Sequence, residues 1–130
     1  MSTTIEVVVL ERALKLMEAG HCTHRFARDA AAYEVDVFSE DAVEFCAVGA
    51  IHRAYGEITG VRGSEQEEPQ GEAFRIVSGV HHNLARLNDI FGLEMAGRLI
   101  QRRLDVLRGK EVGRALTIWE HMRVWKENNW

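Results

Sequence analysis

The chain has few of the features that mark secreted or membrane proteins. Its 130 residues include two cysteines, Cys22 and Cys46, which are too few for a disulfide framework. It holds no apolar run long enough to cross a bilayer, and no secretory signal precedes the first predicted helix. We therefore expect a reduced, cytoplasmic environment and no membrane partner.

Strong positive charge is also absent, because the net charge is −4. This balance argues against general nucleic-acid binding. The basic residues that do cluster lie in the segment 98–114: Arg98, Arg102, Arg103, Arg108, Lys110 and Arg114. Asp105 and Glu111 interrupt this segment, so a solvated helix face is the favoured interpretation and nucleic-acid contact is the less favoured one.

Apolar residues at helical spacing are present along most of the chain. We expect a single globular domain over residues 1–130 with a mainly α fold, a compact bundle of four to five helices. The expected helices span about residues 3–19, 39–56, 72–87, 93–107 and 114–125. Glycines and acidic residues predict one mobile loop over about residues 57–71.

The segment 21–38 lacks a clear helical period. Tyr33, Val35 and Val37 alternate with acidic residues, which is the spacing of a strand with one polar face. We therefore expect a short β-hairpin near residues 25–38, with an irregular loop as the alternative.

The helix expected at 39–56 is central to the predicted fold. Ser39 suits its N-cap, which places Cys46 about two turns inside the helix. Cys46, Gly49 and Ala50 form a seam of small residues that a second helix can approach closely. We expect Cys46 to be a buried structural thiol, since free cysteine is commonly buried.

Three motifs occur in a fixed order along the chain. Residues 25–30 read RFARDA, residues 39–50 read SEDAVEFCAVGA with a Cys-x-x-Gly-Ala core, and residues 87–89 read Leu-Asn-Asp. This ordered set resembles a family of small uncharacterised proteins from bacteria and phages, over about residues 5–107.

The chain departs from that family pattern in two places. His21 stands where the family has Trp, and Ala31 or Ala32 stands where the family has a turn glycine. The family carries no established activity. The resemblance therefore implies a helical domain with Cys46 and the Asn-Asp pair as its signature, and it supplies no reaction.

The catalytic candidates are Cys46, His52, His81, Asn88 and Asp89. A thiol nucleophile requires a nearby base and a group that orients the base. The order Cys, His, Asn occurs in papain-like hydrolases, but the local motifs of those enzymes are missing. The amides around Cys46 are expected to bond within the helix, so they would not activate the thiol. We therefore favour a non-enzymatic protein.

The metal-ligand candidates are His21, Cys22 and His24, three donors within four residues. Structural zinc usually takes four such ligands, and this spacing matches no familiar zinc motif. We expect hydrogen-bonded or exposed histidines here, and neither a metal nor a cofactor.

The ligand-binding candidates are Arg28, Asp29, Asn88 and Asp89, polar residues that lie beside apolar segments. Carboxylates in such positions cap helix ends or pair with arginine, and this structural role is the favoured one. A small-ligand cleft lined by these residues is the functional alternative.

The C-terminal residues favour an interaction role. Trp119, Met122 and Trp125 form one stripe of the last expected helix, and Trp130 follows two asparagines. Aromatic and Met side chains are enriched at protein interfaces. We expect a non-enzymatic interaction or self-assembly module that forms a homodimer through Trp125 and Trp130 or binds another protein.

Two alternative functions stay open. The first is a small-molecule or metal-dependent enzyme, or a ligand-binding protein, that uses Cys46, a histidine and Asn88 or Asp89. The second is a nucleic-acid contact through the basic segment 98–114.

Overall fold

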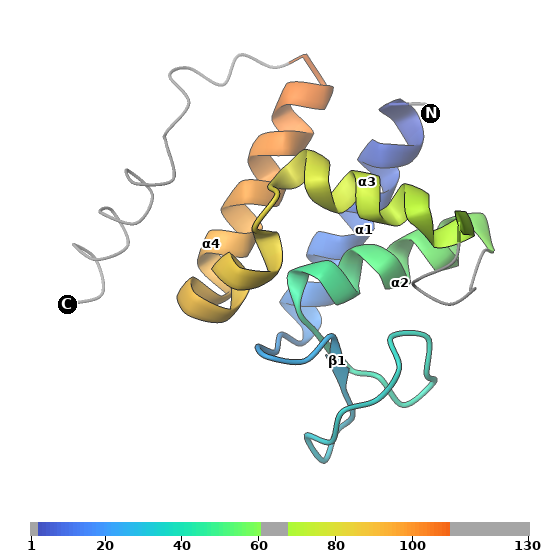
Figure 1. Cartoon of the computed structure of the whole chain (residues 1–130), viewed down its shortest axis with the longest axis vertical. Helices are drawn as coiled ribbons and strands as arrows, with labels where there is room; N and C mark the ends of the chain where they lie inside the picture. The colour runs from blue at the N-terminus through green and yellow to red at the C-terminus, as the bar shows by residue number, and fades with distance from the viewer. Residues whose placement is uncertain (1–2, 61–67, 110–130) are drawn as a thin grey trace.

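The described residues, 3–60 and 68–109, form four helices and one two-stranded sheet in a computed structural model (Figure 1). In chain order the elements are α1 (Thr3–Ala19), β1 (Ala27–Arg28), β2 (Glu44–Phe45), α2 (Ala47–Thr59), α3 (Glu68–Val80) and α4 (Leu84–Leu107). Figure 1 shows α2 and α3 passing in front of α1, with α4 beside them. The mainly α fold predicted from helical spacing is confirmed.

The helix α1 forms one side of the core. Helical spacing predicts that Leu10, Ala13, Leu14 and Met17 form the buried face of this helix. Leu10, Ala13 and Met17 are buried, and Leu14 is partly buried against the same core. Glu6 is also buried, and its Oε1 accepts a hydrogen bond of 3.0 Å from Nε of Arg103. This ion pair joins α1 to α4 across the core.

The helix α2 begins later than the sequence predicts. Ser39, the expected N-cap, instead closes a turn in which its Oγ accepts a bond of 3.1 Å from Asp41 N. The N-cap is Cys46, whose Sγ accepts a bond of 3.3 Å from Gly49 N. The prediction that Cys46 lies inside the helix is therefore wrong.

The segment before α2 is extended because it pairs with distant parts of the chain. Phe45 N donates to Gly20 O at 3.0 Å, and Cys46 N donates to Phe26 O at 3.2 Å. These long-range bonds override the helical spacing of the segment, and local sequence does not reveal them.

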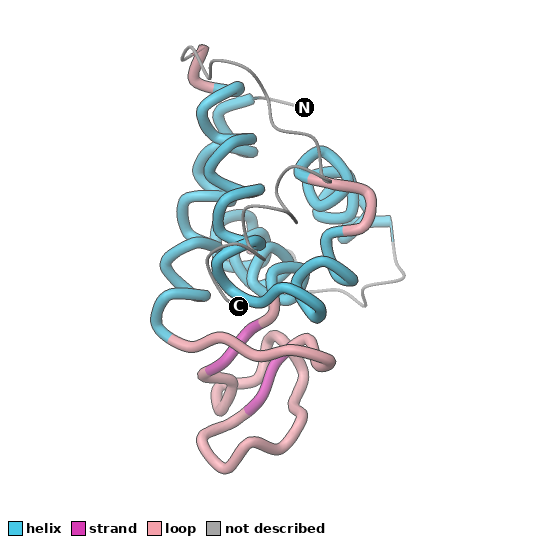
Figure 2. Tube along the Cα trace, turned by 90° about the vertical axis from the view of Figure 1, so that its left-hand side faces the viewer, coloured by secondary structure: helices cyan, strands magenta, loops and turns pink. Residues whose placement is uncertain are grey.

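The strands β1 and β2 are antiparallel, with Ala27 opposite Phe45. The hairpin predicted near residues 25–38 is reduced to an isolated bridge between Arg28 and Glu34. The main partner of β1 is instead the segment before α2, where Phe45 is buried. Figure 2 shows both strands and their loops gathered at one end of the helices.

The single helix predicted over 72–87 is two helices. α3 ends at Val80 and α4 begins at Leu84. Between them, Asn83 N donates to Nδ1 of His81 at 2.9 Å. This local side-chain bond replaces the backbone hydrogen bond that Asn83 N would make in a continuous helix.

The helix α4 continues through Asn88 and Asp89, where the sequence predicts a break. The interruption lies instead at Gly92, whose φ of 77° and ψ of −163° are not helical. Glycine adopts this backbone conformation without the steric cost that a Cβ brings.

Part of the predicted mobile loop is helical, since residues 57–59 belong to α2 and residues 68–71 belong to α3. Residues 61–67 and the predicted helix 114–125 lie outside the described residues. No helix within the described ranges is long and apolar enough to cross a membrane.

Gly49 of α2 lies very close to the backbone of Phe26, the residue before β1. A Cβ at this position would lie 2.0 Å from Phe26 O, a backbone atom. We expect Gly49→Ala to lower the free energy of unfolding by about 3 kcal/mol, at the upper end of overpacking effects. Equilibrium unfolding in urea measures the change.

Gly97→Ala is the matched control, because a Cβ at Gly97 in α4 meets no atom within 4 Å. It should raise the free energy of unfolding by about 0.5–1 kcal/mol, since alanine favours the helix. Equal stability of Gly49→Ala and the wild type would contradict the close approach.

Candidate functional site

A buried polar junction centres on Asn88 of α4, which is fully buried. Its Oδ1 accepts a bond of 3.0 Å from Ala47 N and lies 2.7 Å from Nε2 of His21. Its Nδ2 donates to Cys22 O at 3.3 Å and to Oδ1 of Asp89 at 3.1 Å. One side chain thus joins α4, the first residue of α2 and the turn after α1.

Asp89 extends this junction toward solvent. Its Oδ1 accepts a bond of 2.8 Å from His24 N, and its Oδ2 lies 3.6 Å from Nδ1 of the same histidine. The structure therefore places the Asn-Asp pair where it fastens the turn after α1.

The thiol of Cys46 lies beside the junction and is buried. Burial raises the pKa of Cys46 from 9.0 to about 12, although the hydrogen bond from Gly49 N opposes this shift. A helix N-terminus usually lowers the pKa of a cysteine, but here the loss of water outweighs it. The thiol is therefore protonated at neutral pH.

The candidate bases His52 and His81 make contacts elsewhere in the fold. Among the described residues, the hydrogen bond to Cys46 Sγ comes from Gly49 N and not from a histidine. His52 lies further along α2 and faces the groove described below. His81 stacks on His82 with ring centroids 4.6 Å apart. Within residues 3–60 and 68–109, the structure brings together Asn88, Asp89 and the start of α2 beside a thiol that accepts a backbone hydrogen bond.

The three metal-ligand candidates point to different partners. Nε2 of His21 lies 2.7 Å from Oδ1 of Asn88, and Sγ of Cys22 donates to Arg25 O at 3.4 Å. The His24 side chain is 71% exposed. No set of three His, Cys, Asp or Glu side chains lies close enough to hold a metal within residues 3–60 and 68–109.

The ligand-binding candidates on β1 and after it also make local contacts. Nε of Arg28 lies 2.9 Å from Oε1 of Glu44 in an ion pair between the two strands. Oδ1 of Asp29 accepts bonds of 2.9 Å from both Ala31 N and Tyr33 N. Asp29 thus closes the turn after β1, while Arg28 joins β1 to β2.

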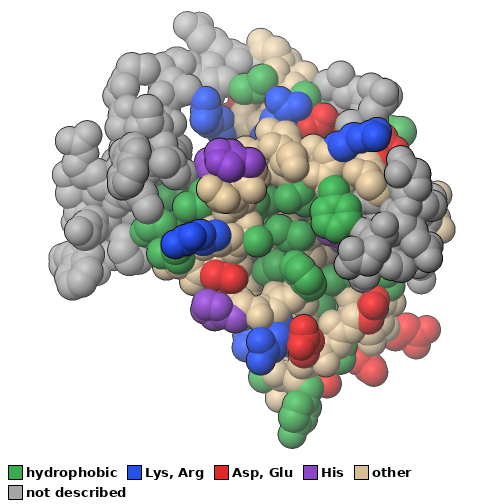
Figure 3. All heavy atoms as spheres, viewed as in Figure 1, with side chains coloured by type: hydrophobic (Ala, Val, Ile, Leu, Met, Phe, Trp, Pro, Cys, Tyr) green, Lys and Arg blue, Asp and Glu red, His purple; other side chains and the backbone are tan. Residues whose placement is uncertain are grey.

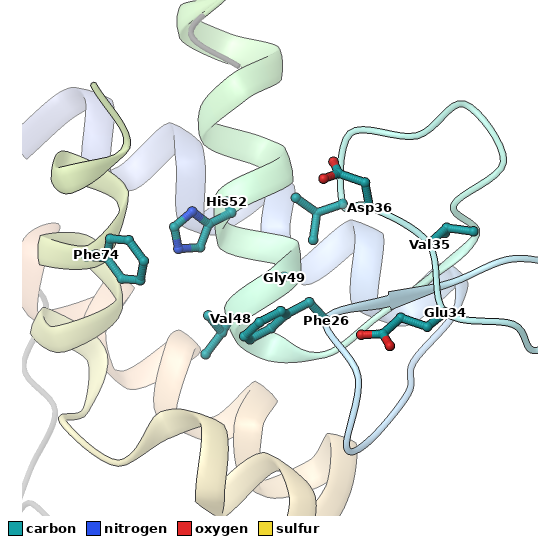
Figure 4. Close-up of a pocket in the computed structure, with 9 residues that line it drawn as sticks. Phe26, Glu34, Val35, Asp36, Val48, Gly49, His52 and Phe74 are labelled. Carbon is teal, nitrogen blue, oxygen red and sulfur yellow. The ribbon is translucent and has the colours of Figure 1, made fainter. Parts of the chain in front are cut away.

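A groove of about 570 Å³ opens between α2, α3 and the loop after β1. Figure 4 shows Phe74 reaching in from α3, Glu34 to Asp36 on the loop opposite, and His52 and Val48 of α2 between them. The residues that line it are Phe26, Glu34, Val35, Asp36, Val37, Val48, Gly49, His52 and Phe74.

The walls of the groove are aromatic and accessible. Phe74 is 41% exposed, and Phe26 is 52% exposed. The His52 ring is buried and meets the Phe74 ring edge-on, with centroids 4.5 Å apart. Figure 3 shows hydrophobic side chains gathered in the middle of this face, with acidic side chains below them. Exposed aromatic surface of this kind is typical of a binding site.

Two carboxylates stand on the loop side of the groove. Oε1 of Glu34 lies 3.7 Å from Nε of Arg25, and both side chains are more than half exposed. Oδ1 of Asp36 accepts a bond of 2.8 Å from Phe38 N, which holds the carboxylate at this edge. The groove is therefore apolar inside and acidic along one side.

The amino-acid sequence matches the model of one known family. The model of a family of unknown function, DUF6197, matches residues 1–119. The chain belongs to this family. The three ordered motifs predict membership in a domain family of unknown function, and this prediction is confirmed. No curated protein and no solved structure matches the chain.

In this DUF6197 chain the sequence motifs contribute to both the polar junction and the groove. Cys46, Asn88 and Asp89 build the junction. Phe26 of the first motif and Val48 and Gly49 of the second line the groove. Sequence reasoning missed the groove because its walls come from segments far apart in the chain. The polar side of the alternating segment 33–37 is the one signal that pointed toward it.

Asn88→Ala tests the polar junction of this family member. It leaves Ala47 N and Cys22 O without their partner in the interior. We expect the free energy of unfolding to fall by about 3–5 kcal/mol, because each buried unpaired group costs about 1–3 kcal/mol. Urea unfolding measures the loss.

Asn83→Ala is the control, because Asn83 is exposed and its side chain makes no cap bond at the start of α4. Its effect should stay within about 0.5 kcal/mol, as for most surface substitutions. If both variants lost a similar amount of free energy of unfolding, the polar junction around Asn88 would not be the cause.

The raised pKa of Cys46 predicts a loss of stability at alkaline pH. The unfolded thiol ionises near pH 9.0, whereas the folded thiol stays protonated up to about pH 12. This contribution is therefore fully present below pH 9.0 and is lost as the pH rises through about 12. Between about pH 9 and 12, the free energy of unfolding measured in urea should fall more steeply for the wild type than for Cys46→Ala. Equal slopes in the two proteins would refute the raised pKa of Cys46.

Proposed function

We propose that this chain is a non-enzymatic interaction module that binds a basic, aromatic peptide segment in its groove. The observation that carries the proposal is the accessible aromatic groove of about 570 Å³ with carboxylates along one side. Its volume lies in the usual range for ligand sites, about 300–1,000 Å³.

The lining chemistry selects the type of segment. An aromatic side chain between Phe26 and Phe74 would remove their exposed surface from water, which favours binding. A Lys or Arg next to that aromatic group would meet the carboxylate of Asp36. Glu34 is also available, because its exposed pair with Arg25 is weak in water.

The sequence itself contains a segment of this chemistry. Trp125 stands between Arg123 and Lys126. These residues lie outside the described ranges, so their role rests on sequence alone. We infer that the occupant is this segment from a second copy of the chain, which continues the predicted homodimer contact through Trp125 and Trp130. Reciprocal exchange between two copies makes a closed symmetric dimer.

Two observations support a non-enzymatic role over the thiol-enzyme alternative. Burial keeps Cys46 protonated at neutral pH, so it is a poor nucleophile. The side chain of Asn88 is fully occupied by hydrogen bonds that hold the fold.

The basic segment 98–114 gives the nucleic-acid alternative little support. Three of its arginines each pair with a carboxylate at 3.0 Å or less: Arg98 with Glu94, Arg103 with Glu6, and Arg108 with Glu11. Lys110 and Arg114 lie outside the described residues. Paired arginines release fewer counterions from a phosphate backbone than unpaired ones do, which weakens binding.

The dimer proposal is tested on the full chain by sedimentation or light scattering over a range of concentrations. Phe74→Ala and Trp125→Ala should each raise the dimer dissociation constant at least about tenfold, because each removes an aromatic anchor. Ile90→Ala is the matched control, since Ile90 is an exposed apolar residue on α4 outside the groove. A wild-type chain that stays monomeric at high concentration would exclude self-assembly.

A charge exchange tests which groups meet in that dimer. Asp36→Lys alone should weaken the dimer, because it places a positive charge beside a basic segment. Combining it with Lys126→Asp should restore part of the lost affinity if the two side chains are neighbours. Additive losses in the double variant would contradict the proposed contact.

A further inference from the structure

The two cysteines lie on adjacent extended segments, although 23 residues separate them in the sequence. Phe45 N donates to Gly20 O at 3.0 Å, and Cys22 N donates to Phe45 O at 3.2 Å. This is the pattern of a parallel bridge between His21 and Phe45. One step further in the same register places Cys22 beside Cys46.

The register also decides where the two side chains point. Residues opposite each other in parallel strands project from the same face, and the strands lie about 4.8 Å apart. Disulfides join Cα atoms about 4.4–6.8 Å apart. If the register of the His21–Phe45 bridge continues by one residue, Cys22 and Cys46 have the backbone spacing and direction that a disulfide requires.

A second contact fixes this spacing. The Asn88 side chain donates to Cys22 O at 3.3 Å and accepts from Ala47 N at 3.0 Å. One amide group thus links Cys22 to the residue next to Cys46. Because Asn88 is fully buried, the two cysteine backbones are held together from a third element.

Each thiol makes sulfur hydrogen bonds within the fold. Sγ of Cys22 donates to Arg25 O at 3.4 Å, and Sγ of Cys46 accepts from Gly49 N at 3.3 Å. Sulfur is a weak donor and a weak acceptor, so rotation of either side chain loses little.

The surroundings make Cys22 the thiol that reacts first. Burial raises the pKa of Cys22, and the nearby guanidinium of Arg28 opposes this shift. Burial raises the pKa of Cys46 further, to about 12. Both cysteines are buried, and Cys22 lies in a turn whose neighbours His24 and Arg25 are exposed.

We propose that Cys22 and Cys46 form a reversible disulfide by exchange with a small-molecule disulfide such as glutathione disulfide. The Cys22 thiolate attacks one sulfur of the small disulfide, which forms a mixed disulfide and releases one small thiol. The Cys46 thiol then loses its proton, which is slow because burial raises its pKa to about 12, and attacks Sγ of Cys22 to release the second small thiol. The protein loses two electrons and two protons in total, and the small disulfide gains them.

The bridge has a defined consequence for the fold. It joins the turn after α1 to the N-cap of α2 and closes the segment between them. Phe26, Glu34 and Asp36 belong to that segment, so one side of the groove would be held at both ends. This inference rests on the cysteine register and is independent of what the groove binds.

The test equilibrates the folded full chain with mixtures of reduced and oxidised glutathione, followed by acid quenching and mass spectrometry of non-reduced peptides. We expect a Cys22–Cys46 cross-link as the main oxidised product. The same equilibration in urea should yield a ratio of cross-linked to reduced chain that is at least about tenfold lower, because the unfolded chain does not hold the thiols together.

Thermal unfolding provides a second readout. The oxidised wild type should unfold about 5–10 °C higher than the reduced form, as expected for a closed loop of this size. Cys22→Ala and Cys46→Ala each keep one thiol, so neither should show a shift in Tm on oxidation.

Three outcomes would overturn the proposal, and each is read from the wild type without relying on a variant. They are two unreacted thiols in the presence of excess glutathione disulfide, separate glutathione adducts on both cysteines, and a cross-link no more favoured in the folded chain than in urea.

Discussion

The arrangement of the other elements depends on the buried side-chain amide of Asn88. Its oxygen and nitrogen contact Ala47, His21, Cys22 and Asp89, which come from three parts of the chain. Each buried polar group left unpaired costs about 1–3 kcal/mol, so the amide stabilises only the arrangement that satisfies all of its partners. It therefore sets the relation between α4, the start of α2 and the turn after α1.

That relation separates two kinds of chemistry in the molecule. The polar groups that look reactive in sequence are used inside the fold, where Cys46 caps α2 and Asp89 holds His24. The groove, in contrast, keeps Phe26 and Phe74 accessible beside acidic side chains. The polar junction is therefore buried, whereas the aromatic walls of the groove are open to solvent.

The same backbone pairing has two further effects. By drawing Phe45 between Gly20 and the strand β1, it delays the start of α2 and turns a predicted interior cysteine into the N-cap. It also pairs His21 with Phe45, the residues that precede Cys22 and Cys46. The close approach at Gly49 belongs to this region, since its missing Cβ leaves room for the backbone of Phe26.

The sequence by itself determined the mainly α fold and the buried face of α1, because a helix repeats every 3.6 residues and Leu10, Ala13 and Met17 follow that period. It misplaced the start of α2, because that start depends on hydrogen bonds between distant segments. It also misplaced the break near Asn88, which lies instead at residues 81–83 and at Gly92. Only the tertiary structure decided that Phe26 and Phe74 share a groove and that His21 pairs with Phe45. Local spacing reports which residues share a face of one element, whereas long-range pairing decides which faces meet.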